Sequence, residues 1–319
     1  LYYQIYIIFI SIMLAHICTF YLENKIRKKI FFKSKLSIFS LCGALFVLTL
    51  IMGFYARQEN AAQILKNDKV SEAIRNIEKD YDYTCMHSNN NKCFIGAEQK
   101  DPLIISIGDS HSGALNSSLN LLLREYDIGG ITYNSAGYRP FIKFARSDRL
   151  NSDKLAHKEL IKILNQESIR YIILHSYWYD SIMLNYIDSS TNKSINGKIA
   201  MMNGLQNLLD LFPNKKFIFI EDVPSSEKFD ASRYARQIIF GNQYEMKIKI
   251  TEYNHMISEY GEIINNLTKN NNFEYLDISK IFCDDNYCRP GNFYRNQDHL
   301  NDLGAKKLLD ELNLSLYLE

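Results

Sequence analysis

The chain opens with two long apolar segments. Residues 1–22 and 36–55 contain no Asp, Glu, Lys or Arg. Because a helix needs about 20 mostly apolar residues to cross the hydrocarbon core of a bilayer, each segment predicts a transmembrane helix. Two buried core helices are the alternative, which is disfavoured because core helices are rarely free of charged residues over such a length.

Beyond residue 101, short apolar runs alternate with amphipathic stretches. Strands are predicted at 102–108, 128–134, 170–176, 215–223 and 273–278, and helices at 110–125, 153–167, 197–212, 243–269 and 302–314. Alternating strands and helices are typical of a parallel sheet with helices on both faces. We therefore expect an α/β fold, a three-layer α/β/α sandwich with a five-stranded parallel sheet. In such a fold, ligands bind at the carboxyl ends of the strands.

The segment between these regions predicts the domain boundaries. Residues 61–80 carry apolar side chains on one helical face and charged side chains on the other, which is typical of an amphipathic helix. We interpret this helix as a stalk that leads away from the membrane. Three parts are therefore expected: two transmembrane helices in residues 1–56, a helical stalk or linker in residues 57–84, and a folded domain in residues 85–319.

The charges between the two apolar segments predict how they are oriented. The basic residues there are Lys25, Arg27, Lys28, Lys29, Lys33 and Lys35, and the acidic residue is Glu23. Because basic loops stay in the cytoplasm, residues 57–319 are expected outside it. The first segment lacks the basic start and the cleavage site of a signal peptide. Since the chain starts with Leu1 inside an apolar segment, we interpret it as the C-terminal piece of a longer membrane protein.

Composition and charge exclude several classes of protein. The 319 residues are 46% hydrophobic and 23% charged, which is typical of a folded protein rather than a disordered tail or a fibre. Lys and Arg together number 37, and Asp and Glu number 36, so the formal net charge is +1. This balance argues against a strongly basic nucleic-acid-binding protein.

The six cysteines fall into two groups. Cys18 and Cys42 lie inside the apolar segments, whereas the others form two close pairs, Cys85 with Cys93 and Cys283 with Cys288. Four cysteines allow three disulfide connectivities, of which local pairing is the simplest. Disulfides indicate an oxidising compartment. A zinc site made from the four thiolates is the alternative, but the C-x7-C and C-x4-C spacings differ from those of common zinc modules.

Three sites of chemical interest follow predicted strands. Gly108-Asp109-Ser110-His111-Ser112 ends the first strand and places Ser110 at the start of a helix, where it could also be a simple N-cap. Gly137 follows the second strand and could offer its N–H to a ligand, or form an ordinary turn. His299 precedes the last helix. None of these signals is specific by itself.

Together, these motifs resemble the SGNH hydrolase family. The resemblance is strongest to a subtype in which Gly-Asp-Ser-His opens the domain and Asp-His-Leu, here residues 298–300, closes it. In that subtype the SGNH domain follows a multispanning acyltransferase family 3 membrane domain, and residues 1–56 resemble the last spans of that fusion. Both close cysteine pairs are also features of the subtype.

The resemblance implies acyl transfer, most often O-acetylation, to a cell-surface polysaccharide such as lipopolysaccharide O-antigen. The expected location is the bacterial inner membrane, as a multi-pass protein with its C-terminal domain in the periplasm. Acetyl-CoA would be the acyl donor of the full-length protein, while this domain would bind no cofactor and no metal. The expected partners are the glycan acceptor, the lipid bilayer and the missing N-terminal membrane acyltransferase domain, with no nucleic acid.

The resemblance also implies roles for individual residues. Ser110 would be the nucleophile, His299 its general base, and the N–H groups of Ser110 and Gly137 an oxyanion hole. The family usually has Asp three residues before the catalytic His, a position that Asn296 occupies here. The site could therefore be a Ser110–His299 dyad, could use Asp298 as the third member, or could be impaired.

Further residues near the strand ends are candidates for substrate binding. Asp109 is expected to organise its loop, and His111 to line the pocket. Trp178 follows the third strand, where many SGNH enzymes use an Asn as an oxyanion donor and the fused subtype often has a Trp. Aromatic residues that could stack on sugar rings are Tyr133, Tyr138, Trp178 and Tyr179.

Three other functions remain open. A deacetylase or esterase would use the same Ser–His pair with water as the acceptor. A non-catalytic glycan-binding domain is favoured by Asn296 and disfavoured by the presence of Ser110 and His299. A metal-dependent phosphoesterase would use His111, His175 and His299, but Asp109 and His111 are the only close pair of potential ligands in the sequence that supports it.

Overall fold

The computed structural model describes residues 12, 13, 16, 19, 43–51, 92–230, 233, 234, 237 and 245–311. Contacts divide the chain into two units, Leu1–Lys66 and Asn67–Glu319. Residues 43–51 are helical, but most of the two predicted transmembrane helices and the whole predicted stalk lie outside the described residues. No helix formed by the described residues is both long enough and apolar enough to cross a membrane.

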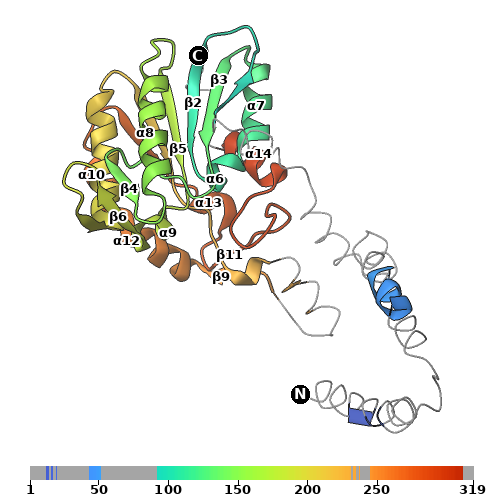
Figure 1. The fold of residues 1–319 in the computed structure, drawn as a ribbon. Coiled ribbons are helices and arrows are strands. Elements are labelled where there is room, and N and C mark those ends of the chain that lie inside the picture. The colour runs from blue at the N-terminus through green and yellow to red at the C-terminus, as the bar shows by residue number, and fades with distance from the viewer. Residues whose placement is uncertain are drawn as a thin grey trace. The chain divides into compact units, whose positions relative to one another are not determined.

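A six-stranded sheet forms the centre of the C-terminal unit (Figure 1). Its strands, in spatial order, are β1 (Lys92–Gly96), β3 (Gly129–Asn134), β2 (Pro102–Gly108), β5 (Tyr171–His175), β8 (Lys216–Ile220) and β10 (Phe273–Leu276). The last five correspond to the five predicted strands and run parallel to one another. Their carboxyl ends therefore share one edge of the sheet, which is where ligands bind in such folds.

β1 corrects the expectation of an all-parallel sheet. It pairs antiparallel with β3 at the edge, so the sheet is mixed. Within β1, Phe94 is exposed and only Ile95 and Gly96 are buried. An edge strand has one neighbour and faces solvent along its free side, so it needs no continuous apolar run. The hydrophobic pattern therefore did not predict it.

Helices cover both faces of the sheet, as expected for a three-layer sandwich. They are α7 (Asn116–Glu125), α8 (Leu150–Leu164), α10 (Gly197–Leu211), α12 (Ile250–Leu267) and α14 (Asp302–Glu311). Successive strand residues point to opposite faces, so Ile105 belongs to the core under α8 and α10, while Ile104 belongs to the core under α7 and α14. Figure 1 shows these two helix pairs on opposite sides of the sheet.

Three predicted helices differ in their bounds, and the simplest case is the predicted helix 153–167, which is α8 and lies three residues earlier at each end. The predicted helix 110–125 is divided into α6 (Ser110–Gly113) and α7, because Leu115 N–H bonds to the carbonyl of Ser112 in a tighter turn. The predicted helix 243–269 begins only at Ile250, since the two preceding residues form the short strand β9.

Small elements complete the C-terminal unit. β9 (Ile248–Lys249) pairs with β11 (Tyr287–Cys288), and a separate sheet contains β4 (Phe144–Arg146), β6 (Asn185–Asp188) and β7 (Ser194–Asn196). Short helices are α9 (Trp178–Met183), α13 (Ser279–Phe282) and the 3-10 turn η2 (Glu227–Phe229).

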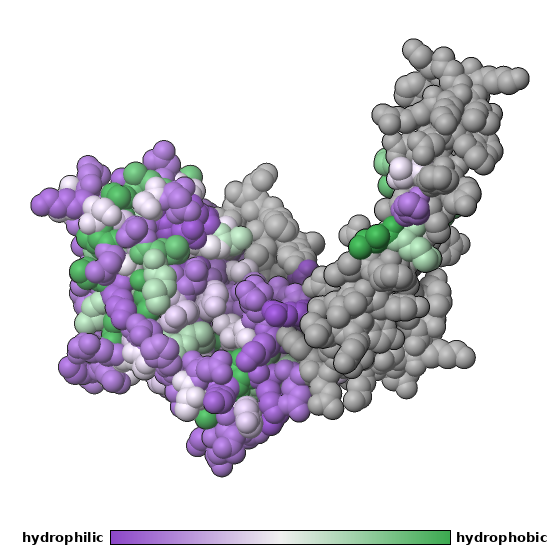
Figure 2. Space-filling model, turned by 90° about the horizontal axis from the view of Figure 1, so that it is seen from below, coloured by the Kyte–Doolittle hydropathy of each residue, from purple (hydrophilic) through white to green (hydrophobic). Residues whose placement is uncertain are grey.

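The three described cysteines of the C-terminal unit, Cys93, Cys283 and Cys288, are disulfide-bonded. Cys283 and Cys288 form a disulfide, which rules out the four-thiolate zinc site. Cys93 is also disulfide-bonded, and its predicted partner Cys85 lies outside the described residues. The visible surface of this unit in Figure 2 is largely hydrophilic, with apolar residues scattered among polar ones. Scattered apolar residues are normal on a protein surface.

Candidate active site

Ser110 lies at the carboxyl end of β2, on the first turn of α6. Asp109 precedes it and accepts a hydrogen bond from the His111 N–H at 2.8 Å, which caps the helix. Gly108 is required by a close approach of two backbones, because a Cβ there would lie 1.8 Å from the carbonyl oxygen of His175. The end of β2 therefore packs directly against the end of β5.

Ser110 and His299 are 189 residues apart in sequence and in direct contact in the structure. Ser110 Oγ lies 2.7 Å from His299 Nε2. The other ring nitrogen, Nδ1, faces two acceptors: Asp298 Oδ1 at 2.7 Å and Asn296 Oδ1 at 3.1 Å. Neither an ionised carboxylate oxygen nor an amide oxygen carries a hydrogen, so both can only accept. The ring nitrogen Nδ1 must therefore carry the proton. Nε2 is then free to accept the Ser110 hydroxyl proton.

Asn296 and Asp298 contact His299 in different ways. Asn296 Oδ1 also accepts hydrogen bonds from the N–H groups of His299 at 2.9 Å and Asp298 at 3.2 Å, so its amide holds the backbone of this loop. Asp298 makes the shorter contact with Nδ1 and carries the charge. The structure thus brings together the two residues that the sequence leaves as alternatives, with the carboxylate closer to the ring.

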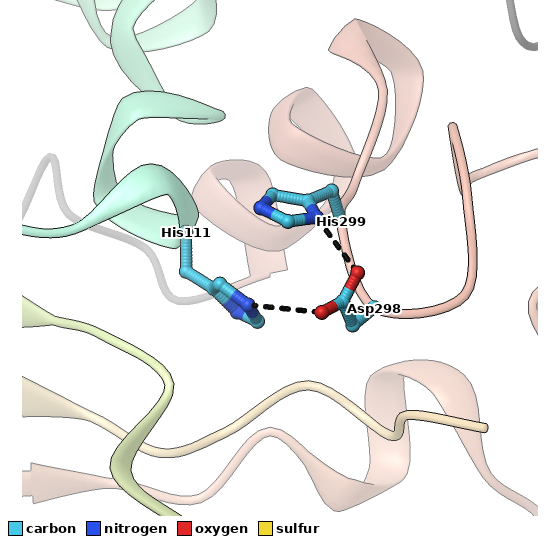
Figure 3. A group of neighbouring side chains, drawn as sticks. All are labelled: His111, Asp298 and His299. Atoms are coloured by element: carbon cyan, nitrogen blue, oxygen red, sulfur yellow. Dashed lines mark hydrogen bonds and ion pairs between the residues drawn. The ribbon is translucent and has the colours of Figure 1, made fainter. Parts of the chain in front are cut away.

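The Asp298 carboxylate lies between two imidazole rings (Figure 3). Oδ1 faces His299, and Oδ2 lies 3.8 Å from Nε2 of His111. Burial by itself would raise the pKa of Asp298, but His111 and His299 outweigh burial and hold that pKa well below its usual range. Asp298 is therefore ionised at neutral pH, as a partner for a protonated histidine must be.

Asp109, which directly precedes Ser110, forms a buried ion pair with Arg139. Both side chains are 3% exposed. Burial alone would raise the pKa of Asp109, but Arg139, His111 and two backbone N–H groups together lower it. Arg139 also contacts Ser181 and Asp180 on α9. No motif in the sequence points to Arg139, and the one available signal is its position two residues after Gly137 in a mostly apolar stretch.

Gly137 lies in the loop that follows β3. Its φ of +70° is in the left-handed region that glycine favours. Its carbonyl accepts a hydrogen bond from Arg146 Nη1 at 3.1 Å. The same loop is joined to the nucleophile strand, because Ser135 N–H donates to the carbonyl of Gly108 at 3.3 Å.

Trp178, which was predicted to bind substrate, has its side chain in the core rather than in an open cavity. Its side chain is fully buried, stacks on Phe219 at 4.4 Å between ring centres and donates its indole N–H to the carbonyl of Ile220. Tyr133 and Tyr138 are also buried and cannot stack on a sugar. Trp178 is the first residue of α9, and its ring packs inward between Phe141 and Phe219.

A cavity of about 330 Å³ opens at the carboxyl edge of the sheet. Its lining includes Tyr177, Tyr179, Ser225, Glu252, Gln297 and Asp298. Of the four predicted sugar-stacking residues, only Tyr179 lies there. A larger cavity of about 550 Å³ lies at the amino ends of β5 and β8 and contains none of the site residues described above.

The structure does not assemble the three histidines of the phosphoesterase hypothesis as one ligand set. Among the described residues, the group with metal-ligand spacing is His111, Asp298 and His299. His175 is buried, and burial, followed by the nearby His111, lowers its pKa to about 3. The two nitrogens of His299 already face Asp298 and Ser110.

Comparison with known proteins agrees with this fold. Residues 78–313 match the SGNH domain that is fused to AT3 domains. One similar solved structure is the periplasmic domain of a lipopolysaccharide acetyltransferase from Salmonella ser. Paratyphi A, at 19% identity and a TM-score of 0.49, covering 70% of this chain and 86% of that chain. Another is a Streptococcus pneumonia protein described as a platelet activating factor, at 16% identity and a TM-score of 0.44. That match covers 82% of this chain and 100% of the other chain.

No curated protein matches the chain significantly. The match to residues 78–313 nevertheless covers most of the sequence and contains every residue of the site described above. The chain therefore belongs to the family of SGNH domains that are fused to AT3 domains.

Proposed function

We propose that this protein transfers an acyl group, most often acetyl, to a hydroxyl of a cell-surface polysaccharide such as lipopolysaccharide O-antigen, through an acyl ester on Ser110. The contact between Ser110 Oγ and His299 Nε2, at 2.7 Å, carries the proposal. A serine hydroxyl is a weak nucleophile until an adjacent base accepts its proton, and a third group must orient that base. Asp298 supplies the third group here.

The first half-reaction acylates the serine. Ser110 Oγ attacks the carbonyl carbon of the acyl donor while His299 Nε2 takes the hydroxyl proton. When the tetrahedral intermediate collapses, the bond to the donor breaks and His299 returns the proton to the leaving group. Asp298 stabilises the imidazolium that exists between these steps, since its carboxylate remains ionised.

The oxyanion is stabilised by the N–H groups of Ser110 and Gly137. Ser110 contributes as the first residue of α6, and Gly137 from the loop joined to the end of β2. Loss of one such donor typically costs about 2.7–4 kcal/mol of barrier. The positive φ of Gly137 lets the loop turn there without the strain that a side chain would add.

The second half-reaction passes the acyl group to a sugar. The sugar hydroxyl gives its proton to His299 Nε2 and attacks the ester carbon, and Ser110 Oγ leaves and regains the proton. The cavity beside Asp298 offers hydrogen-bonding groups and the ring of Tyr179, which suit a sugar. If water reaches the ester first, the same residues perform hydrolysis and the protein is an esterase.

The proposed setting is the periplasmic side of a bacterial inner membrane. Residues 1–22 and 36–55 would anchor the chain, and acetyl-CoA would supply the acyl group through the membrane domain of the full-length protein. Membership of a family fused to AT3 domains supports this arrangement. The disulfide between Cys283 and Cys288 supports an oxidising compartment.

A labelling experiment tests the nucleophile. The 319-residue chain, purified in detergent, is treated with a fluorophosphonate, and the modified residue is located by mass spectrometry beside Ser110→Ala and His299→Ala. We expect modification of Ser110 in the parent protein and a large loss of rate in His299→Ala. If the folded protein is not modified at Ser110, the mechanism is refuted and a non-catalytic glycan-binding domain becomes the favoured function.

A second experiment separates transfer from hydrolysis. The protein is supplied with p-nitrophenyl acetate, with and without oligosaccharide acceptors, and the products are analysed by mass spectrometry. Acetylated oligosaccharide that depends on Ser110 supports a transferase. Acetate as the sole product at saturating acceptor would assign an esterase instead.

A further inference from the structure

Asp298 needs an anchor outside its own loop. It is adjacent to His299 in sequence, so the backbone alone leaves the carboxylate free to rotate away from the imidazole. In the structure, Oδ1 lies 2.7 Å from His299 Nδ1, while Oδ2 lies 3.8 Å from His111 Nε2. Figure 3 shows the carboxylate held between the two rings.

His111 is itself firmly held. Its side chain is 2% exposed, and its backbone N–H bonds to Asp109. Its ring stacks on Tyr177 at 4.9 Å between centres, with 18° between the planes. A buried ring that is stacked and carried by the nucleophile helix is a rigid reference point. Its position relative to Ser110 is fixed by the chain itself.

The polar contacts of His111 point to one role. At 3.8 Å, the contact between His111 Nε2 and Asp298 Oδ2 is longer than a hydrogen bond but within ion-pair distance, and it is favourable when Nε2 carries its hydrogen, because an ionised carboxylate only accepts. Among the described residues, no hydrogen-bond partner contacts the other nitrogen, Nδ1, and Asp298 is the only acidic group within ion-pair distance of the ring. The other carboxylate that His111 influences, Asp109, is paired with Arg139, which leaves Asp298 as the acidic partner of the imidazole in this region.

Asn296 explains why such an anchor matters. Its Oδ1 also lies near His299 Nδ1, at 3.1 Å, so a carboxylate at position 296 would reach the same nitrogen. An amide can orient the imidazole but carries no charge to balance an imidazolium. The charge therefore has to come from Asp298, whose orientation the loop does not determine.

We propose that His111 is a positioning residue that holds the Asp298 carboxylate against His299 and so compensates for the neutral Asn at position 296. This inference rests on the proposed Ser110 acyl-enzyme chemistry. It predicts that His111 becomes dispensable when position 296 carries a carboxylate.

A double-mutant cycle tests the dependence. The 319-residue chain in detergent is compared with His111→Phe, Asn296→Asp and the double variant, using kcat and KM for p-nitrophenyl acetate. Phe preserves the stacking on Tyr177 but removes the donor. Because a misplaced catalytic group typically costs about 100-fold in rate, we expect kcat to fall by about 10- to 100-fold in His111→Phe with little change in KM. When Asn296→Asp is already present, adding His111→Phe should lower kcat by less than about threefold.

A conservative variant distinguishes positioning from packing. Gln places an N–H close to where His Nε2 lies, so His111→Gln should retain most of the kcat that His111→Phe loses. The proposal would be overturned if His111→Phe lowered kcat equally with Asn and with Asp at position 296. It would also be overturned if His111→Phe left kcat unaffected. Circular dichroism establishes that each variant is folded, and His111→Leu replaces His111→Phe in the cycle if the latter unfolds.

Proton NMR provides a test that does not require turnover. The hydrogen-bonded Nδ1–H of His299 should give a downfield signal in the parent protein and in His111→Gln. The signal should broaden or disappear in His111→Phe and return in the double variant. An unchanged signal in His111→Phe would refute the positioning role, whereas failure of Ser110 to react would refute only the acyl-enzyme chemistry.

Discussion

Asp298 Oδ1 lies 2.7 Å from His299 Nδ1, closer than the amide oxygen of Asn296 at 3.1 Å. A carboxylate that directly precedes His299 thus lies where the resemblance to the family led us to expect one from three residues earlier. Asn296 has a different task, since its oxygen accepts the backbone N–H groups of residues 298 and 299. The altered motif therefore retains a charged partner for the histidine.

Asp298→Asn should strongly impair the reaction of Ser110. Asn would keep the size of the side chain but remove the charge that supports the imidazolium and specifies its tautomer. The expected loss is about 100- to 10,000-fold in the rate of fluorophosphonate labelling. Asp310→Asn, on the exposed face of α14, is the matched control and should leave the rate unchanged. A loss below threefold in Asp298→Asn would show that Ser110 and His299 act as a dyad.

Arg139→Met should destabilise the C-terminal unit. The substitution leaves the Asp109 carboxylate buried without its cation, which typically costs about 3–5 kcal/mol. Urea unfolding followed by circular dichroism measures the change. Lys306→Met, which breaks an exposed pair with Asp310, should have a far smaller effect. If the two variants were equally stable, the buried pair would have no structural role.

Gly137→Ala should reduce both stability and labelling of Ser110. A non-glycine residue at a φ of +70° costs about 1–2 kcal/mol. The nearest groups to an added Cβ are the ends of two flexible arginine side chains, so steric clash adds little. Gly291→Ala is the control, because its φ is +54° and an added Cβ would make only ordinary van der Waals contact with the ring of Phe293. Similar destabilisation with a normal labelling rate is expected for the control. Because alanine keeps the backbone N–H, equal labelling rates in both variants would show that the loop conformation at Gly137 does not set the reactivity of Ser110.

The buried carboxyl of Glu221 should make stability fall as pH rises. It accepts hydrogen bonds from Tyr253 at 2.7 Å and the Ile278 N–H at 3.0 Å, but burial raises its pKa from 4.5 to about 7. Between about pH 4.5 and 7 the folded state therefore holds a proton that the unfolded state releases. The unfolding free energy should decrease through this window, by up to about 3 kcal/mol, and level off above it.

Glu221→Gln isolates this contribution. Asp222, whose pKa burial raises to about 8, adds a second decrease of the same sign, so the comparison must be between the parent and the variant at each pH. Urea unfolding from pH 4.5 to 8 should show the parent losing more stability than Glu221→Gln. Parallel curves would show that Glu221 does not titrate in this range.

Much of the sheet could be predicted because its strands are short, continuously apolar and bounded by polar turns. The predicted strand 215–223 contains all of β8 and also Glu221 and Asp222, whose buried side chains the pattern does not explain. The predicted helix 243–269 extended too far because β9 is two residues long and is defined only by its pairing with β11. Helix periodicity reports one buried face and says little about where a helix ends.

By itself, the sequence determined where along the chain the five parallel strands lie and the identity of Ser110 and His299 as candidates, because local patterns and short motifs express both. Only the tertiary structure decided how the charge at the site is arranged. Arg139 reaches Asp109 across 30 residues, and Asp298 meets His111 across a still longer separation. It also placed Trp178 in the core. Such contacts depend on which strand ends and loops become neighbours in space, and no local pattern records that.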